Sequence, residues 1–272
     1  MEKLICAICN SDQSNVIYNI ESEFSEVYDI VKCPECNFVY LNPKPSKNEM
    51  RKYYNNNYLP HLTLDNFYLK IFKKISYFWK MKQIKNYSDT KNNHIDIGGG
   101  NGSFSKYLNN NGYKSFSYDP FYNDNISNIS AIPNSSYEIA TLWHSIEHMH
   151  DIHAMLNDIY AITKKDASIY IACPNFNSID RMIFKKKWAA LDVPRHLYHF
   201  TPKSIKNLLK KHNLEIIKIK SMPQDTIFNI FLSLKSDIFI FFKLLPLLIF
   251  SYLYNIFVSG SCSSYLYICK KK

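Results

Sequence analysis

The sequence predicts an α/β protein with a doubly wound, parallel sheet, and two observations support that class. Short apolar stretches alternate with helix-like stretches from residue 94 onward, and a glycine-rich loop joins the first apolar stretch to a helix-like one. Such alternation is typical of parallel sheets whose crossovers are helices. The hydrophobic content of 46% is ample for a core in a chain of 272 residues.

The elements follow in order along this part of the chain. Strands are expected at 94–98, 113–118, 137–143, 168–173, 214–220 and 264–269, and helices at 103–111, 151–164 and 202–212. Residues 120–136 are Asn-rich and short, so any helix there should be stunted. Asp151 and Thr201 are expected to cap the helices that follow them, with Pro202 at the first helical position after Thr201.

Four of the seven cysteines form two Cys-x-x-Cys pairs, Cys6 with Cys9 and Cys33 with Cys36. Each pair lets two thiolates approach one tetrahedral ion, and a closed site of four thiolates is typical of structural zinc. The first ten residues lack the apolar core of a signal peptide, which favours zinc over two disulfides. We therefore expect a zinc-ribbon-like module at 1–45, with hairpin strands at 16–20 and 38–41.

A helical linker is expected at 46–90, between this module and the sheet-bearing domain at 91–272. The rigid sequence Asn-Pro-Lys-Pro at 42–45 ends the module. Ser46, followed three residues later by Glu49, is a capping-box pattern that starts a helix over 46–54. A second, longer helix is expected at 64–87, where apolar residues recur at helical spacing.

The stretch from His94 to Gly102 is the most informative in the chain. The protein has only 6 glycines, and four of them lie here: Gly98, Gly99, Gly100 and Gly102. A glycine loop between a strand and a helix lets a ligand meet main-chain N–H groups. Asp96 precedes the glycines, and Asp119 closes the next strand, where a carboxylate can accept both hydroxyls of a ribose. The spacing alone also fits a dinucleotide site or a turn without a ligand.

Residues 226–258 are strongly apolar but interrupted by Lys235, Asp237 and Lys243 and broken by Pro246. The uninterrupted run after Lys243 is about fifteen residues, short of the ~20 that a spanning helix needs. Because a last strand is expected after this segment, the chain must return to the sheet, which favours a helical hairpin. Three environments remain open for it: the core or a dimer interface, a membrane face, or a span.

Two loops at the carboxyl ends of expected strands carry the candidate catalytic groups. Ligands of open α/β sheets bind at this edge, and histidine is suited to proton removal near neutral pH. Arg195 is a candidate for binding a phosphate or carboxylate of a substrate. His150 and His153 are expected on the solvent face of the helix that Asp151 caps. The candidate catalytic residues are His144, Glu147, His148, His196 and His199.

Together these motifs resemble a known family. The spacing from Asp96 to Gly102 resembles motif I of class I S-adenosylmethionine-dependent methyltransferases. With the segments 33–45, 146–148 and 194–202, it looks like the zinc-module methyltransferases of bacterial surface-polysaccharide biosynthesis, a group similar in layout to sugar C-methyltransferases. Those relatives use a Glu-His pair as the base where this chain has Arg195-His196, so the histidine matches and the glutamate does not.

The resemblance implies a Rossmann-like, seven-stranded methyltransferase sheet with an apolar helical insertion before its last strand. It implies that Asp96 and the glycines bind S-adenosylmethionine and that Asp119 binds its ribose, with Pro120 and Trp143 beside them. It also implies a structural zinc ion on the four cysteines.

The expected activity is methyl transfer to a hydroxyl, or an acidic carbon, of a sugar, nucleotide-sugar or phosphoryl-sugar, with a histidine base, His196 first. This interpretation also predicts a small-molecule substrate and a cytoplasmic location. Residues 226–258 would then contact the inner face of the membrane or a second copy of the chain. Three alternatives remain open: an RNA methyltransferase, a lipid or quinone O-methyltransferase, and a non-catalytic zinc scaffold. The net charge of +10 favours RNA, but the basic residues are scattered without a stacking platform, so a nucleic-acid partner is not expected.

Overall fold

The computed structural model describes residues 4–54, 67–88, 93–120, 129–234, 240–258 and 260–272. Its main feature is a sheet of strand order β5-β4-β6-β7-β10-β9. The six strands lie close to the positions expected from the sequence: β4 (Asn93–Ile97), β5 (Lys114–Tyr118), β6 (Tyr137–Trp143), β7 (Thr163–Pro174), β9 (Leu214–Ser221) and β10 (Ser264–Lys271). Seven strands were expected from the resemblance; residues 121–128, which follow β5, lie outside the described residues.

The expected Rossmann-like sheet is confirmed, and its parallel order is broken at one strand. β4, β5, β6 and β7 are parallel, but β10 runs antiparallel to both β7 and β9. Tyr265 near the start of β10 lies opposite Ser221 at the end of β9. The connection from β9 to β10 therefore starts and ends at the same edge of the sheet. If β10 were parallel to β9, the connection would have to cross to the opposite edge.

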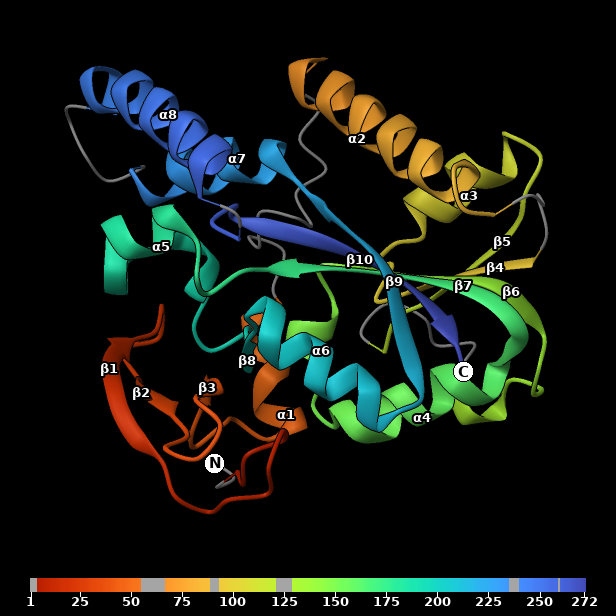
Figure 1. Cartoon of the computed structure of the whole chain (residues 1–272), viewed down its shortest axis with the longest axis horizontal. Helices are drawn as coiled ribbons and strands as arrows, with labels where there is room; N and C mark the ends of the chain where they lie inside the picture. The colour runs from red at the N-terminus through yellow and green to blue at the C-terminus, as the bar shows by residue number, and fades with distance from the viewer. Residues whose placement is uncertain (1–3, 55–66, 89–92, 121–128, 235–239, 259) are drawn as a thin grey trace.

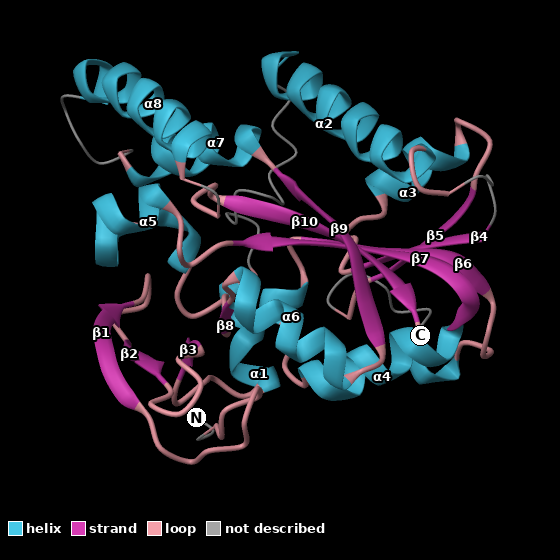
Figure 2. Cartoon of the chain, in the orientation of Figure 1, coloured by secondary structure: helices cyan, strands magenta, loops and turns pink. Residues whose placement is uncertain are grey.

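Helices cover both faces of the sheet, as Figures 1 and 2 show. One face carries α2 (Phe67–Lys85), α3 (Ser103–Asn109), α7 (Pro223–Ser233) and α8 (Ile240–Phe257). The other face carries α4 (Ile152–Ile162) and α6 (Pro202–Lys211), and α5 (Ile179–Phe184) follows β7. The apolar insertion thus forms two helices between β9 and β10. Among the helices of the described residues, none combines the length and apolarity that crossing a bilayer requires.

The expected helix caps are confirmed. The Asp151 side chain accepts from the backbone N–H of Ala154 at 3.0 Å. Thr201 and Ser204 form a capping box with Pro202 in the first turn of α6. Ser46 and Glu49 form the same motif at α1 (Lys47–Met50), which continues as the 3-10 helix η1 (Arg51–Tyr53). Such caps satisfy backbone donors that a helix start leaves open.

The N-terminal part forms a second, antiparallel sheet of order β1-β2-β3-β8. Its strands are β1 (Asn15–Glu21), β2 (Val27–Lys32), β3 (Val39–Leu41) and β8 (Tyr198–His199). The sequence located β1 and β3 but neither β2 nor β8. β8 comes from a distant part of the chain, and the backbone N–H of Leu41 also donates to the carbonyl of Leu197 at 2.9 Å.

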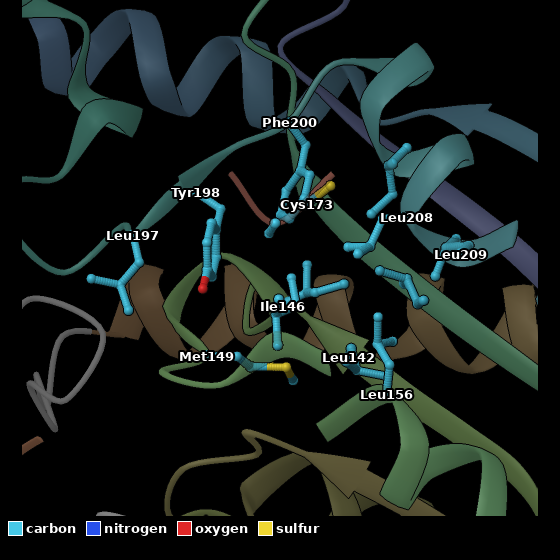
Figure 3. Close-up of a cluster of buried hydrophobic side chains, with 14 of the residues drawn as sticks. Leu142, Ile146, Met149, Leu156, Cys173, Leu197, Tyr198, Phe200, Leu208 and Leu209 are labelled. Atoms are coloured by element: carbon cyan, nitrogen blue, oxygen red, sulfur yellow. The ribbon is translucent and has the colours of Figure 1, made fainter. Parts of the chain in front are cut away.

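The two sheets share one apolar core. Ile30 and Phe38 of the N-terminal part belong to the same cluster as Leu142 of β6 and Leu208 of α6. Figure 3 shows the part of this cluster where Leu197, Tyr198 and Phe200 lie near Ile146 and Met149. A smaller apolar cluster fills the space between helices α2 and α3 and the face of the large sheet that they cover. The shared core fixes residues 196–200 against the carboxyl edge of the large sheet.

Candidate active site

The glycine loop joins β4 to α3 in a conformation that only glycine adopts without strain. Gly98, Gly100 and Gly102 have φ of 73°, 56° and 71°. The backbone N–H of Gly100 donates to the buried carboxylate of Asp119 at 2.9 Å. A Cβ built on Gly100 meets no heavy atom of the described residues within 4 Å, so the loop is open to them at this position. A ligand can therefore approach the backbone beside Asp119.

Asp96 is held by a relay of buried side chains. Its Oδ1 accepts a hydrogen bond from the Thr141 hydroxyl at 2.6 Å. The Thr141 hydroxyl oxygen in turn lies 2.9 Å from His94 Nε2. His94 Nδ1 lies 2.6 Å from the Ser115 hydroxyl, and burial lowers the pKa of His94 to about 3, so its ring is neutral. Burial raises the pKa of Asp96 to about 6, against the Thr141 hydrogen bond. The sequence showed His94 beside the motif but not its part in orienting Asp96.

Trp143 is the last residue of β6. In the strand order β5-β4-β6 it therefore lies on one side of β4, and Asp119, which follows β5, lies on the other. Its ring is 8% exposed and packs edge-on against Phe104 and Trp79. The ammonium of Lys80 in α2 lies 4.9 Å from the Trp143 ring centroid. Sequence analysis missed Lys80, because the helix was recognised only by its apolar spacing. Pro120, the other residue expected beside the cofactor, directly follows Asp119 and is exposed.

The segment after β6 packs directly on the glycine loop. His144 has a left-handed φ of 52°, and the Ser145 hydroxyl donates to the carbonyl of Ile97 at 2.8 Å. The 3-10 helix η4 (Ile146–His148) then places Glu147 in the interior with no exposed surface. Glu147 Oε1 lies 3.4 Å from His144 Nδ1 and 4.0 Å from His196 Nε2.

The charges of His144 and Glu147 depend on each other. Burial lowers the pKa of His144, but Asp225, whose Oδ2 lies 2.8 Å from His144 Nε2, and Glu147 outweigh burial and raise the pKa to about 10. Burial raises the pKa of Glu147, but the hydrogen bond and charge of His144 outweigh it, and the net pKa is lowered. His144 is therefore a cation and Glu147 an anion near neutral pH. Asp225 in α7 had no signal in the sequence.

His196 has one ring nitrogen available. Its Nδ1 lies 2.8 Å from the carbonyl of Ala190, so this nitrogen carries the hydrogen and donates it. Nε2 then holds the lone pair and faces Glu147 and Asp192, whose Oδ2 is 3.8 Å away. The backbone N–H of Leu197 donates to the carbonyl of Glu147 at 2.8 Å, which joins the two loops.

The other two histidine candidates are held as weak bases. His148 Nδ1 lies 3.0 Å from the Arg195 carbonyl and from the Tyr54 hydroxyl, and burial, then the charge of His196, lowers its pKa to about 4. His199 is buried in β8 with its ring against Phe176, and burial lowers its pKa to about 3. Ligand atoms of Glu147, His148 and His196 lie within 4.8 Å of one another.

Two expectations about neighbouring residues are corrected. Arg195 does not present a free guanidinium, because its nitrogens donate to Asp192, Glu23 and the Tyr53 carbonyl. His153 is not on a solvent face. Its Nε2 lies 3.0 Å from the carbonyl of Ala7, and its Nδ1 lies 2.8 Å from His212 Nε2. Both side chains join the N-terminal part to the large sheet.

The four N-terminal cysteines converge with the geometry of a metal site. Sγ of Cys6 lies 3.4 Å from that of Cys36, and Sγ of Cys9 lies 3.5 Å from that of Cys33. All four ligand atoms lie within 4.8 Å of one another, and all four thiols are free. Each pair is followed by an asparagine, Asn10 or Asn37, with φ of 62°, a conformation that asparagine tolerates. Four thiolates at zinc–sulfur distances of about 2.3 Å would stand roughly 3.8 Å apart, so the residues fit a zinc ion.

The mixed α/β sheet, with a glycine loop flanked by Asp96 and Asp119, agrees with the class that the family model shows: this is an S-adenosylmethionine-dependent methyltransferase. A model of the methyltransferase-domain family matches residues 66–219, more than half of the chain, so the protein belongs to that family. No curated protein matches the chain.

Solved structures of methyltransferases have similar folds, and two of them serve as examples. One is a SAM-dependent methyltransferase from Archaeoglobus fulgidus, with 17% identity and a TM-score of 0.47 over 76% of this chain and 100% of that one. The other is a geranyl diphosphate C-methyltransferase from Streptomyces coelicolor A3(2), with 13% identity and a TM-score of 0.45 over 71% of this chain and 81% of that one.

Proposed function

We propose that this protein transfers a methyl group to a hydroxyl, or an acidic carbon, of a sugar, either nucleotide-linked or phosphorylated, in cell-surface polysaccharide biosynthesis. The observation that carries the chemical part is the Nε2 lone pair of His196, which faces the carboxylate of Glu147 beside the glycine loop. The sugar class rests on the sequence resemblance. The cofactor supplies an activated methyl group on a sulfonium. Asp96 binds its ammonium, Asp119 binds its ribose, and most of the rate comes from positioning.

His196 is the base in this proposal. The proton of the acceptor hydroxyl passes to Nε2 while the oxygen–carbon bond forms and the carbon–sulfur bond breaks. The imidazolium that results is stabilised by Glu147 at 4.0 Å and Asp192 at 3.8 Å. His148 and His199 have lowered pKa values, and His144 already carries its proton, so none of the three suits this task as well.

The test combines turnover with cofactor binding. His196→Gln should lower kcat by about 10²- to 10⁴-fold, the usual contribution of a positioned base, while the Kd for S-adenosylmethionine stays near that of the wild type. The acceptor is sought by mass spectrometry in a panel of nucleotide-sugars and sugar phosphates. His212→Gln, which changes a histidine of the α4–α6 contact, serves as the matched control. Full turnover by His196→Gln would exclude this base.

The zinc ion has a structural role in this proposal. Cys6, Cys9, Cys33 and Cys36 bind it and hold the turns that precede β1 and β3. Because β3 pairs with β8, the ion indirectly supports residues 196–199. Metal analysis of the purified protein should find one zinc per chain, and loss of that zinc in a Cys36→Ser variant would tie it to this site.

A second candidate acceptor is a lipid-linked sugar or another lipid, and a specific surface favours it. Side chains of α7 and α8 expose a large apolar area: Ile227, Phe228, Phe231, Leu245, Ile249, Phe250 and Leu253. The adjacent α5 packs on both helices and is followed by three exposed lysines at 185–187. Apolar side chains next to lysines are typical of proteins that bind anionic membrane surfaces.

Co-sedimentation with vesicles tests the membrane contact. Binding to vesicles with anionic lipid, lost in a Phe228→Ser/Phe250→Ser double variant and kept in Phe116→Ser, would support it. Phe116 is an exposed apolar residue on β5 and serves as the matched control. A stable dimer in solution that the double variant dissociates, without vesicle binding, would instead assign the surface to a second copy.

A further inference from the structure

Lys80 forms no hydrogen bond or close ion pair with the residues that the structure describes, although the carboxylates of Asp96 and Asp225 act on its charge. Its ammonium lies 4.9 Å from the ring centroid of Trp143, 5.4 Å from that of Phe104 and 5.9 Å from that of Tyr77. Aromatic faces attract a cation, but they leave its N–H donors without acceptors. The ammonium therefore keeps donors for an anion that the described residues do not hydrogen-bond to it.

Trp143 supplies a second unused donor at the same place. Its side chain is 8% exposed, and its Nε1–H has no hydrogen-bond acceptor within the described part of the chain. Buried indole N–H groups usually find a partner. Two donors, one of them charged, thus lie beside each other without an acceptor among the residues that the structure describes.

The position of this pair relative to the glycine loop is informative. Phe104 stands at the start of α3, directly after the loop, and Trp143 ends β6, the neighbour of β4 on the side opposite β5. Asp119 at the end of β5 flanks the loop on one side, and Lys80 with Trp143 flanks it on the other. Burial lowers the pKa of Lys80, whereas the charges of Asp96 and Asp225 raise it, so both carboxylates are near enough to act on the ammonium.

We propose that Lys80 and the Trp143 indole N–H bind the α-carboxylate of S-adenosylmethionine. A ligand whose ribose is on Asp119 and whose ammonium is on Asp96 has its carboxylate next to that ammonium, on the β6 side of the loop. This inference rests on the cofactor part of the proposed function and is independent of the acceptor. Charge-assisted hydrogen bonds to a carboxylate are roughly twice as strong as neutral ones, so the pair orients the cofactor as well as binding it.

The test compares ligands that differ only in the carboxylate. Calorimetry with the full-length, zinc-loaded protein measures the Kd of S-adenosylmethionine and of decarboxylated S-adenosylmethionine, which keeps the sulfonium and the amine. The wild type should prefer the carboxylate-bearing ligand by about tenfold or more, since the decarboxylated ligand cannot accept the hydrogen bonds of the ammonium and the indole. Lys80→Gln should lose that preference and bind the decarboxylated ligand like the wild type. Trp143→Phe, which keeps a ring but lacks the N–H, should lose part of it.

Two further variants keep the result interpretable. Lys82→Gln removes a charge from an exposed position of the same helix and should leave both affinities unchanged. Lys80→Arg keeps the charge and should retain most of the preference. Equal weakening of both ligands by Lys80→Gln, or no weakening of either, would overturn the carboxylate assignment. Failure of the wild type to bind either ligand would instead count against the proposed cofactor site, and no outcome depends on the acceptor.

Discussion

Ser145 occupies the space that a side chain at Gly98 would need. A Cβ built on Gly98 lies 2.4 Å from the Cβ of Ser145, while the Ser145 hydroxyl donates to the carbonyl of Ile97 at 2.8 Å. The loop that carries Glu147 is therefore fixed directly against the glycine loop. This contact explains how the candidate base and the glycines are brought to one place.

The first prediction compares two glycines of the loop. Gly98→Ala combines a left-handed φ of 73° with the clash against Ser145 and should lower the free energy of unfolding by about 2 kcal/mol or more. Gly100→Ala has a φ of 56° but open space around its Cβ, so only the backbone cost of about 1–2 kcal/mol applies. Because the N–H of Gly100 donates to Asp119, the residue proposed to bind the ribose, Gly100→Ala should weaken cofactor binding while the protein remains folded.

Urea denaturation and calorimetric titration check this pair of variants. A Gly98→Ala protein as stable as the wild type would contradict the contact with Ser145. A Gly100→Ala protein with unchanged affinity for S-adenosylmethionine would show that the ligand does not approach the loop at this position.

Features encoded locally in the sequence could be predicted. The glycines from Gly98 to Gly102 predicted the turn between β4 and α3, and Asp151 and Thr201 predicted the starts of two helices. Both predictions were possible because helix caps and glycine turns depend only on neighbouring residues. The two Cys-x-x-Cys pairs likewise predicted a cluster whose four sulfur atoms the fold brings together.

Features that depend on distant contacts could not be predicted. β8 is a two-residue strand that exists because β3 provides its partner, and nothing in the local sequence marks it. Asp225 reaches His144 only because the connection between β9 and β10 returns to the edge that carries the site. Lys80 lies on α2. The apolar spacing of this helix predicts which face is buried, but it does not predict where the ammonium of one lysine will lie.

The second prediction concerns the pH dependence of stability. The pKa of His144 in the folded protein is about 10, because Asp225 and Glu147 outweigh burial, whereas an unfolded chain has the ordinary value near 6.5. The folded state holds this proton more tightly, so its stabilising effect is complete below pH 6.5 and is lost as the pH rises toward 10. The side chain is 35% exposed, so solvent screening reduces the size of the effect.

Asp225→Asn isolates this contribution. The free energy of unfolding of the wild type should fall more steeply between pH 7 and pH 9.5 than that of the variant, and the two curves should approach each other at high pH. Urea denaturation at several pH values measures both. Parallel curves over this range would show that the pair makes no pH-dependent contribution to stability.

The third prediction concerns cofactor binding at low pH. Burial raises the pKa of Asp96 to about 6, and an ammonium ligand requires the ionised carboxylate. Affinity for S-adenosylmethionine should therefore be highest near pH 7, where the carboxylate is ionised and the ligand's amine is protonated. It should fall at lower pH as the carboxylate is protonated, by up to about tenfold per pH unit. Asp96→Asn should bind weakly with little dependence on pH between 5 and 8. A wild-type affinity that does not change down to pH 5 would remove Asp96 from contact with the ammonium.

The last prediction separates the proposed zinc module from the proposed cofactor site. Loss of zinc, by chelation or by Cys9→Ser, should loosen β3 and with it β8, because Val39 pairs with His199. Leu197, whose N–H donates to the Glu147 carbonyl, then loses its support on one side. Structural zinc contributes roughly 10–16 kcal/mol in isolated fingers, so a marked fall in melting temperature is expected. Methyl transfer should fall about tenfold or more, because the base is mispositioned.

The Kd for S-adenosylmethionine should change little in the same zinc-free protein, since the glycine loop is held by β4, β5 and Ser145. Cys262→Ala, which changes a cysteine outside the cluster, should keep its zinc and its turnover. Metal analysis, thermal melting, turnover and calorimetry on the three proteins give the comparison. If loss of zinc abolished cofactor binding and turnover together, the module would support the whole sheet through the shared core. If turnover survived the loss of zinc, β8 would hold His196 in place without the module.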